Sequence, residues 1–75
     1  MIFLIEYNRL EGRLVKFTAF DDLQQVEAER QRLEIELDLN RRGIAHEVVL
    51  LEAVTEEALR RTHRRYFENL SQISS

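Results

Sequence analysis

The amino-acid sequence predicts an α+β domain in which two strands, a helix, a third strand and a second helix follow in that order. Three observations favour it: an apolar hairpin pattern over residues 1–20, a run of helix formers over residues 22–40, and a strand followed by a helix over residues 44–70. We expect a two-layer domain, with a three-stranded antiparallel sheet in the order 2-1-3 and two helices. All 75 residues are assigned to this single domain.

The first segment, MIFLIEYNRLEGRLVKFTAF, has two arms rich in β-branched and aromatic residues on either side of Gly12. If residues 10–12 form a three-residue loop, Gly12 supplies its left-handed position. The register that follows gives one fully apolar face and places Glu6 opposite Lys16 on the other. The pairs on the apolar face are Tyr7 with Val15, Ile5 with Phe17, and Phe3 with Ala19.

Residues 22–40 lack glycine and proline and consist largely of strong helix formers. Asp21 or Asp22 can cap the start, with a glutamine three residues on, and Gly43 or Asn40 can end the helix. At about 100° per residue the apolar residues form two stripes on roughly opposite sides. The main stripe holds Leu23, Val26, Leu33 and Leu37, and the second holds Ala28, Ile35 and Leu39. A helix that covers one sheet needs only one stripe, so this helix is expected to have two neighbours.

Residues 44–53 form the third strand, which is apolar on both faces at its centre, as in a sheet covered on both sides. Thr55 then caps the second helix, expected over residues 55–70, with Glu56 and Glu57 in its first turn. The long helix returns the chain, so the third strand runs antiparallel to the first. We expect the first helix to cover the sheet face that carries Phe3, Ile5 and Tyr7.

This arrangement leaves more apolar surface than one subunit covers. If the second helix packs beside the first on the same sheet face, Ile2, Leu4 and one apolar row of the third strand stay uncovered, and such patches usually mark a partner surface. We therefore predict a homodimer, formed either by the free sheet face or by the back of the first helix. The alternative is that the second helix crosses to the other sheet face and the monomer is self-sufficient. The expected dimer surface is made of Ile2, Leu4, Val49, Leu51, Ala28, Ile35 and Leu39.

Composition narrows the classes of function. The chain has no cysteine, a formal charge of −3 and a pI near 5.3, so thiolate metal sites are excluded and a sequence-independent nucleic-acid binder is disfavoured. Only five apolar residues precede Glu6, too few for a membrane span or a signal peptide. We expect a cytoplasmic protein that needs no cofactor and no membrane.

The stretch LRRTHRRYFENL places four arginines on one side of the second helix. We favour a solvated face, in which Glu57 pairs with Arg61 and Arg64 with Glu68. The alternative is a face that binds phosphate groups of a nucleic acid or an acidic protein, because arginine suits bidentate phosphate contacts. We call Arg60, Arg61, Arg64 and Arg65 the arginine fan.

His63 projects to the apolar side of the same helix, where a structural histidine bonded to a carbonyl or hydroxyl is the favoured interpretation. A small nuclease-like hydrolase would need His63 in a cleft with a group that stabilises developing charge, and the arginines point away from it. His46, on the third strand, is interpreted in the same way. No metal spacing and no catalytic residue is assigned.

Arg30 falls inside the main stripe of the first helix, with Glu27 and Glu34 at i−3 and i+4. We favour a side chain held at the stripe edge by these carboxylates, and the alternative is an interface ion pair that fixes the register of a dimer. We interpret the protein as a homodimeric interaction or regulatory module. A nucleic-acid binder that uses the arginine fan is the second hypothesis, and a hydrolase that uses His63 is the third.

Overall fold

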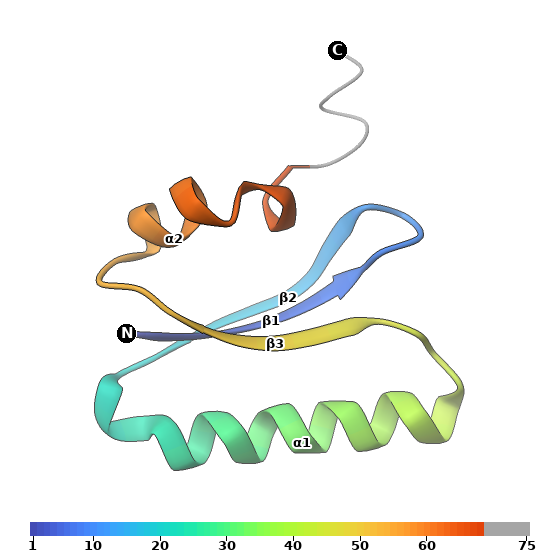
Figure 1. The fold of residues 1–75 in the computed structure, drawn as a ribbon. Coiled ribbons are helices and arrows are strands. Elements are labelled where there is room, and N and C mark those ends of the chain that lie inside the picture. Colours follow the sequence, from blue (N-terminus) through green and yellow to red (C-terminus); the bar gives the residue numbers. More distant parts are fainter. Residues whose placement is uncertain (69–75) are drawn as a thin grey trace.

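The computed structural model describes residues 1–68 and places a three-stranded antiparallel sheet between two helical layers (Figure 1). The α+β class, the order of the elements and the sheet order 2-1-3 are confirmed. The strands are β1 (Ile2–Asn8), β2 (Arg13–Phe20) and β3 (Glu47–Glu52); the helices are α1 (Gln25–Arg42) and α2 (Glu56–Thr62), with short 3₁₀ turns η1 (Asp22–Gln24) and η2 (Arg64–Tyr66).

The hairpin of β1 and β2 has the predicted register from Ile2 opposite Phe20 as far as Glu6 opposite Lys16. Beyond Glu6 the register shifts, so that Tyr7 lies opposite Leu14 and not opposite Val15 as predicted. An irregularity of this kind adds one residue to one strand and increases the local twist.

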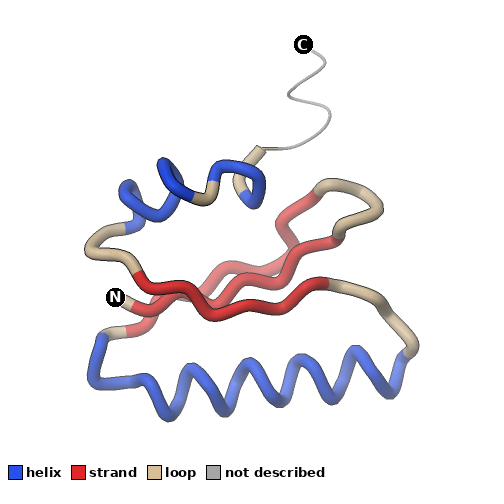
Figure 2. The backbone as a smooth tube through the Cα atoms, in the orientation of Figure 1, coloured by secondary structure: helices blue, strands red, loops and turns tan. Residues whose placement is uncertain are grey.

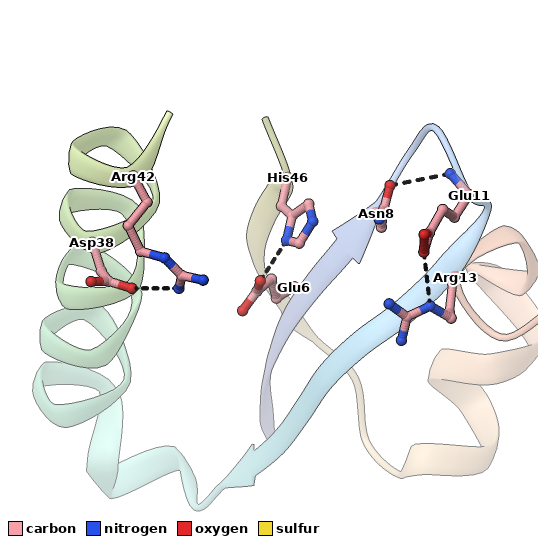
Figure 3. A network of polar contacts seen from close by, with 7 residues as sticks. All are labelled: Glu6, Asn8, Glu11, Arg13, Asp38, Arg42 and His46. Atoms are coloured by element: carbon pink, nitrogen blue, oxygen red, sulfur yellow. Dashed lines mark hydrogen bonds and ion pairs between the residues drawn. The ribbon is translucent and has the colours of Figure 1, made fainter. Parts of the chain in front are cut away.

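The turn of the hairpin contains four residues, 9–12, where three were expected. The side-chain oxygen of Asn8 accepts a hydrogen bond of 3.1 Å from the backbone N–H of Glu11, which closes the wider turn (Figure 3). Gly12 has a φ of 62°, as its predicted left-handed position requires.

The first helix begins and ends with the local chemistry expected of it. Asp21 accepts from the backbone N–H of Leu23, and the side chain of Gln24 accepts from the backbone of Asp21, so the capping box is present. Gly43 ends α1 with a φ of 68°. The backbone N–H of Ile44 bonds to the carbonyl of Leu39, and β3 therefore begins only at Glu47, three residues later than predicted.

The two helices cover opposite faces of the sheet, so the domain has three layers and not two (Figure 2). This is the alternative in which the second helix crosses over. On one face, Phe3, Ile5 and Tyr7 pack with Leu59 and Tyr66 from α2 and η2. On the other, Ile2, Leu4 and Phe20 pack with Ala28 of α1. The expectation that the first helix covers Phe3, Ile5 and Tyr7 is wrong.

α1 also presents its second stripe to the sheet, and not the main stripe. Ala28 and Leu39 are buried and Ile35 is partly buried. Two features explain the choice. Ala28 is small and lets the helix approach the strands closely, and packing the main stripe inward would bury the guanidinium group of Arg30 against apolar strands.

The second helix is shorter than predicted. Thr55 caps it, accepting from the N–H of Ala58 at 3.1 Å, but α2 stops at Thr62 and the chain bends at His63 before η2. The bend brings the Tyr66 ring edge-on to Tyr7, with 5.3 Å between their centroids. Packing of Tyr66 on the sheet thus replaces continuation of the helix. Leu70, which the predicted helix over residues 55–70 would place on the same side as Tyr66, lies outside the described residues.

Candidate functional site

Of the seven residues expected to form a dimer surface, four are buried in the subunit and three are partly buried; the buried ones are Ile2, Leu4, Ala28 and Leu39, and the partly buried ones are Val49, Leu51 and Ile35. We call α2 and η2 together the α2 layer. α1 covers Ile2 and Leu4, which are buried, and the α2 layer packs against Val49 and Leu51 on the opposite sheet face. Ala28, Ile35 and Leu39 are the residues with which α1 contacts the sheet. The prediction placed these seven residues on uncovered faces, whereas helices on opposite sides shelter both faces.

Four of the exposed large apolar side chains belong instead to the main stripe of the first helix. Four large side chains in η1 and α1 point away from the sheet, and we call them the outward stripe. Their exposed fractions are 94% for Leu23, 80% for Val26, 53% for Leu33 and 54% for Leu37. Leucine and valine at this exposure contribute little to the core, so the fold does not require them.

Arg30 lies in the middle of the outward stripe and is held by its own helix. Its Nε donates to Glu27 at 3.0 Å, and its terminal nitrogens pair with Glu27 and Glu34. The hydrogen bonds from Arg30 lower the pKa of the Glu27 carboxyl, and the same carboxyl raises the pKa of Arg30. The expectation that Glu27 and Glu34 hold this side chain is confirmed.

Acidic side chains flank the outward stripe on both sides. At about 100° per residue, Glu27 and Glu34 lie along one border and Glu29 and Glu36 along the other. We call these four residues the acidic rim. Arg30 pairs with Glu27 and Glu34, and Arg32 pairs with Glu36 at 3.7 Å. The rim has four carboxylates against these two guanidinium groups, so it keeps a net negative charge.

Every member of the arginine fan has a carboxylate partner within the chain. Arg60 donates to Glu56 at 2.9 Å and Arg61 to Glu57 at 2.7 Å; Arg64 lies 3.4 Å from Glu68, and Arg65 donates to Glu47 at 2.8 Å. The two predicted i,i+4 pairs are thus present. The Arg60 guanidinium also stacks over Phe67, 4.4 Å from its centroid. The fan therefore has much of its charge offset. Two of its members, Arg60 and Arg65, also help to pack the α2 layer.

One polar cluster was not anticipated from the sequence. Glu47, at the start of β3, accepts from the hydroxyl of Tyr66 and from Arg65, and Arg9 lies 3.8 Å away. The Tyr66 hydrogen bond lowers the pKa of Glu47, whereas burial, and then the bond to Glu47, raises the pKa of Tyr66. The contacts of Arg65 and Tyr66 with Glu47 join residues 18 and 19 positions apart and fasten η2 to the sheet.

The two histidines occupy different environments. Nδ1 of His46 lies 2.6 Å from a carboxylate oxygen of Glu6, on the sheet face beside α1, and Figure 3 shows the pair near Arg42 and Asp38. Nδ1 of His63 lies 2.9 Å from the hydroxyl of Thr62, and its ring stacks on Tyr66. His63 thus has a hydroxyl partner, one of the two kinds of partner expected for a structural histidine.

A hollow lies at the end of the sheet, where Met1 and Ile2 meet η1 and the residues after β3, and its polar lining includes Asp22 and Glu52. Neither histidine lines this hollow. The Met1 amino group there is 2.7 Å from Asp22. Within residues 1–68, no three histidine, aspartate or glutamate side chains converge as a metal site would require.

Comparisons with known proteins add no family. No family model matches the chain, and no curated protein and no solved structure matches it. In the part of the chain that the structure describes, no helix has both the length and the apolarity to cross a membrane.

Proposed function

We propose that this chain is a protein-interaction module that acts through the outward stripe of α1 and not by catalysis. The observation that carries the proposal is that four large apolar side chains of η1 and α1, on the side that faces away from the sheet, are each more than half exposed. Contiguous exposed apolar patches on small proteins usually mark a surface for a partner.

The cost of the stripe to the free protein supports this interpretation. At an exposed helix position, glutamine, glutamate or lysine has nearly the same helix propensity as leucine, and a charge improves solubility. Leu33 and Leu37 therefore gain nothing for the subunit that a polar residue would not also provide. α1 has 18 residues and a length of about 27 Å, which suits contact with a helix of another chain.

The other two hypotheses have less support. A phosphate-binding surface would be strengthened by guanidinium groups without acidic partners, yet each member of the arginine fan is paired with a carboxylate. A hydrolase would be supported by His63 in a hollow beside a second polar group, yet its ring packs on Tyr66.

Photo-crosslinking in cells that express the full chain tests the proposal. A photo-reactive residue replaces Val26, and in a matched protein it replaces Leu10, which is 91% exposed in the hairpin turn. We expect a discrete adduct from position 26 that disappears when Leu33 and Leu37 are changed to glutamine, and none from position 10. An adduct of twice the subunit mass identifies a second copy, and another mass identifies a different protein.

Two results would contradict the proposal. One is that positions 26 and 10 give the same adducts, and the other is that the adduct from position 26 persists in the Leu33→Gln, Leu37→Gln protein. Either would mean that the outward stripe is not the contact surface.

A further inference from the structure

We propose that the occupant of the outward stripe is an amphipathic helix of another protein, with an apolar seam bordered by lysine or arginine. This inference rests on the proposed function and adds the chemistry of the partner. It is drawn from the spacing of the stripe and from the charge of the acidic rim.

The spacing of the stripe is that of a helix that packs along a second helix. Leu23, Val26, Arg30, Leu33 and Leu37 follow one another at intervals of three, four, three and four residues. An average interval of 3.5 residues keeps a seam facing one partner helix along its whole length. Leu23 and Leu37 are equivalent positions in this repeat, as are Val26 and Leu33.

Arg30 occupies the remaining position of the seam. The carboxylates of Glu27 and Glu34 on its own helix already pair with Arg30. The seam can thus be covered while this guanidinium keeps its partners.

The acidic rim disfavours a second copy of the chain in this position. Residues that border a seam meet the bordering residues of the partner helix. In an antiparallel pair, Glu27 of one copy lies next to Glu34 of the other, and Glu29 next to Glu36. In a parallel pair, Glu29 meets Glu34, and the two Arg30 side chains face each other. Both orientations bring like charges together, which selects against self-pairing.

The same rim favours a basic partner. Glu27, Glu29, Glu34 and Glu36 line both borders for more than two turns of α1, and lysine or arginine on the facing helix would lie opposite them on either side. The basic α2 layer lies on the far side of the sheet, so it does not neutralise this face (Figure 1).

Two synthetic helical peptides test the charge of the partner. Both carry leucine at the seam positions, one has lysine at the bordering positions, and the other has glutamate there. Binding to the full chain is measured by fluorescence anisotropy at 50 mM and 500 mM salt. We expect the lysine peptide to bind at least about 10-fold more tightly at low salt, with an advantage that shrinks at high salt because the charges are exposed. Equal affinity, or tighter binding of the glutamate peptide, would overturn the inference.

Charge reversal in the protein supplies the matched control. In Glu29→Lys, Glu36→Lys the preference between the peptides should fall to parity or reverse. The control Glu11→Lys, Glu57→Lys makes the same change in net charge away from α1, in the hairpin turn and in α2, and should keep the preference for the lysine peptide. The same loss of preference in both double variants would show that net charge and not the acidic rim is responsible, and would overturn the inference.

The failure of this inference and that of the proposed function are distinguishable. Leu33→Gln, Leu37→Gln should abolish binding of the lysine peptide, and Leu10→Gln should not. If the Leu33→Gln, Leu37→Gln protein binds neither peptide and the native chain binds both peptides equally, the outward stripe is the interaction surface but its partner need not be basic. Sedimentation that shows a dimer at micromolar concentration, lost in Leu33→Gln, would assign the stripe to a second copy and overturn the inference. If the stripe variants keep all binding, the proposed function fails as well.

Discussion

The two helical layers of this protein use their apolar residues in different ways. The α2 layer is short and bends at His63, and its large apolar side chains Leu59 and Tyr66 are buried against the sheet. α1 is long and unbroken, and it buries Ala28 and Leu39 while the outward stripe faces solvent. The difference shows that apolar content along a helix does not by itself measure what that helix contributes to the core.

The polar contacts differ in the same way. The α2 layer is joined to β3 by the bonds of Arg65 and Tyr66 to Glu47. The arginines of α1 instead pair with carboxylates one turn away on the same helix, as Arg42 does with Asp38. The α2 layer therefore has long-range polar contacts to the sheet in addition to its apolar packing, whereas α1 is held by the packing of its inward residues.

The largest difference in the free energy of unfolding is expected between substitutions of two leucines, one from each helical layer. Leu59→Ala removes a fully buried side chain from the α2 layer, and we expect it to lower the free energy of unfolding by about 3 kcal/mol. Leu33→Ala, on the outward stripe, should change it by less than about 0.5 kcal/mol. Urea denaturation of the two variants measures both. Similar losses would mean that the outward stripe is part of the core and would break the comparison.

A medium effect is expected for the polar link of the α2 layer. Tyr66→Phe keeps the ring and removes the hydroxyl that Glu47 accepts, so we expect a loss of about 1 kcal/mol at neutral pH. The pKa of Tyr66 is raised in the folded protein, so its contribution is present below the ordinary tyrosine value of 10.0 and is lost as the pH rises through the raised value.

Urea midpoints from pH 7 to pH 11 check this. The difference between the native chain and Tyr66→Phe should narrow towards alkaline pH. On the acid side, the pKa of Glu47 is lowered, so its contribution is lost as the pH falls below 4.5 through the lowered value, and less so in Tyr66→Phe. A difference that stays constant from pH 7 to pH 11 would argue against the Tyr66 contact.

The smallest effect on stability is expected at Arg30. Arg30→Met removes exposed ion pairs, which contribute little, so the free energy of unfolding should change by less than about 0.5 kcal/mol. The acidic rim stays in place and disfavours self-pairing, so the variant should remain a monomer when sedimentation is measured at micromolar concentration. A dimer, or a large loss of stability, would contradict the roles assigned to the acidic rim and the outward stripe.

Local signals predicted much of the fold. The register of the hairpin from Ile2 to Glu6, the positive φ of Gly12, and the caps at Asp21 and Thr55 all depend on residues close in sequence. The choice between the two stripes of α1 is not local, because both can cover a sheet. One signal was available: Arg30 lies within the main stripe, and a guanidinium is costly to bury against strands.

The candidate site was harder to predict for the same reason. The dimer surface was placed on residues that α1 and the α2 layer cover from opposite sides of the sheet. The position of α2 depends on contacts between residues far apart, such as Tyr66 with Tyr7 and with Glu47. The same contacts end the helix at Thr62, where its amphipathic pattern would have let it continue. By contrast, the partners of Arg60 and Arg61 lie four residues before them and can be identified in the sequence.

The most deeply covered strand is the first to be synthesised. β1 can pair with β2 once residue 20 has been synthesised. Pairing of Ile2 with Glu52 on the other edge of β1 requires β3, and packing of Phe3 and Ile5 against Leu59 requires α2. At a synthesis rate of about 5–20 residues per second, the apolar side chains of β1 lack their packing partners from β3 and α2 for a few seconds. During that interval the apolar faces of the nascent hairpin can make non-native contacts. The core is complete only when β3 and α2 have packed on β1.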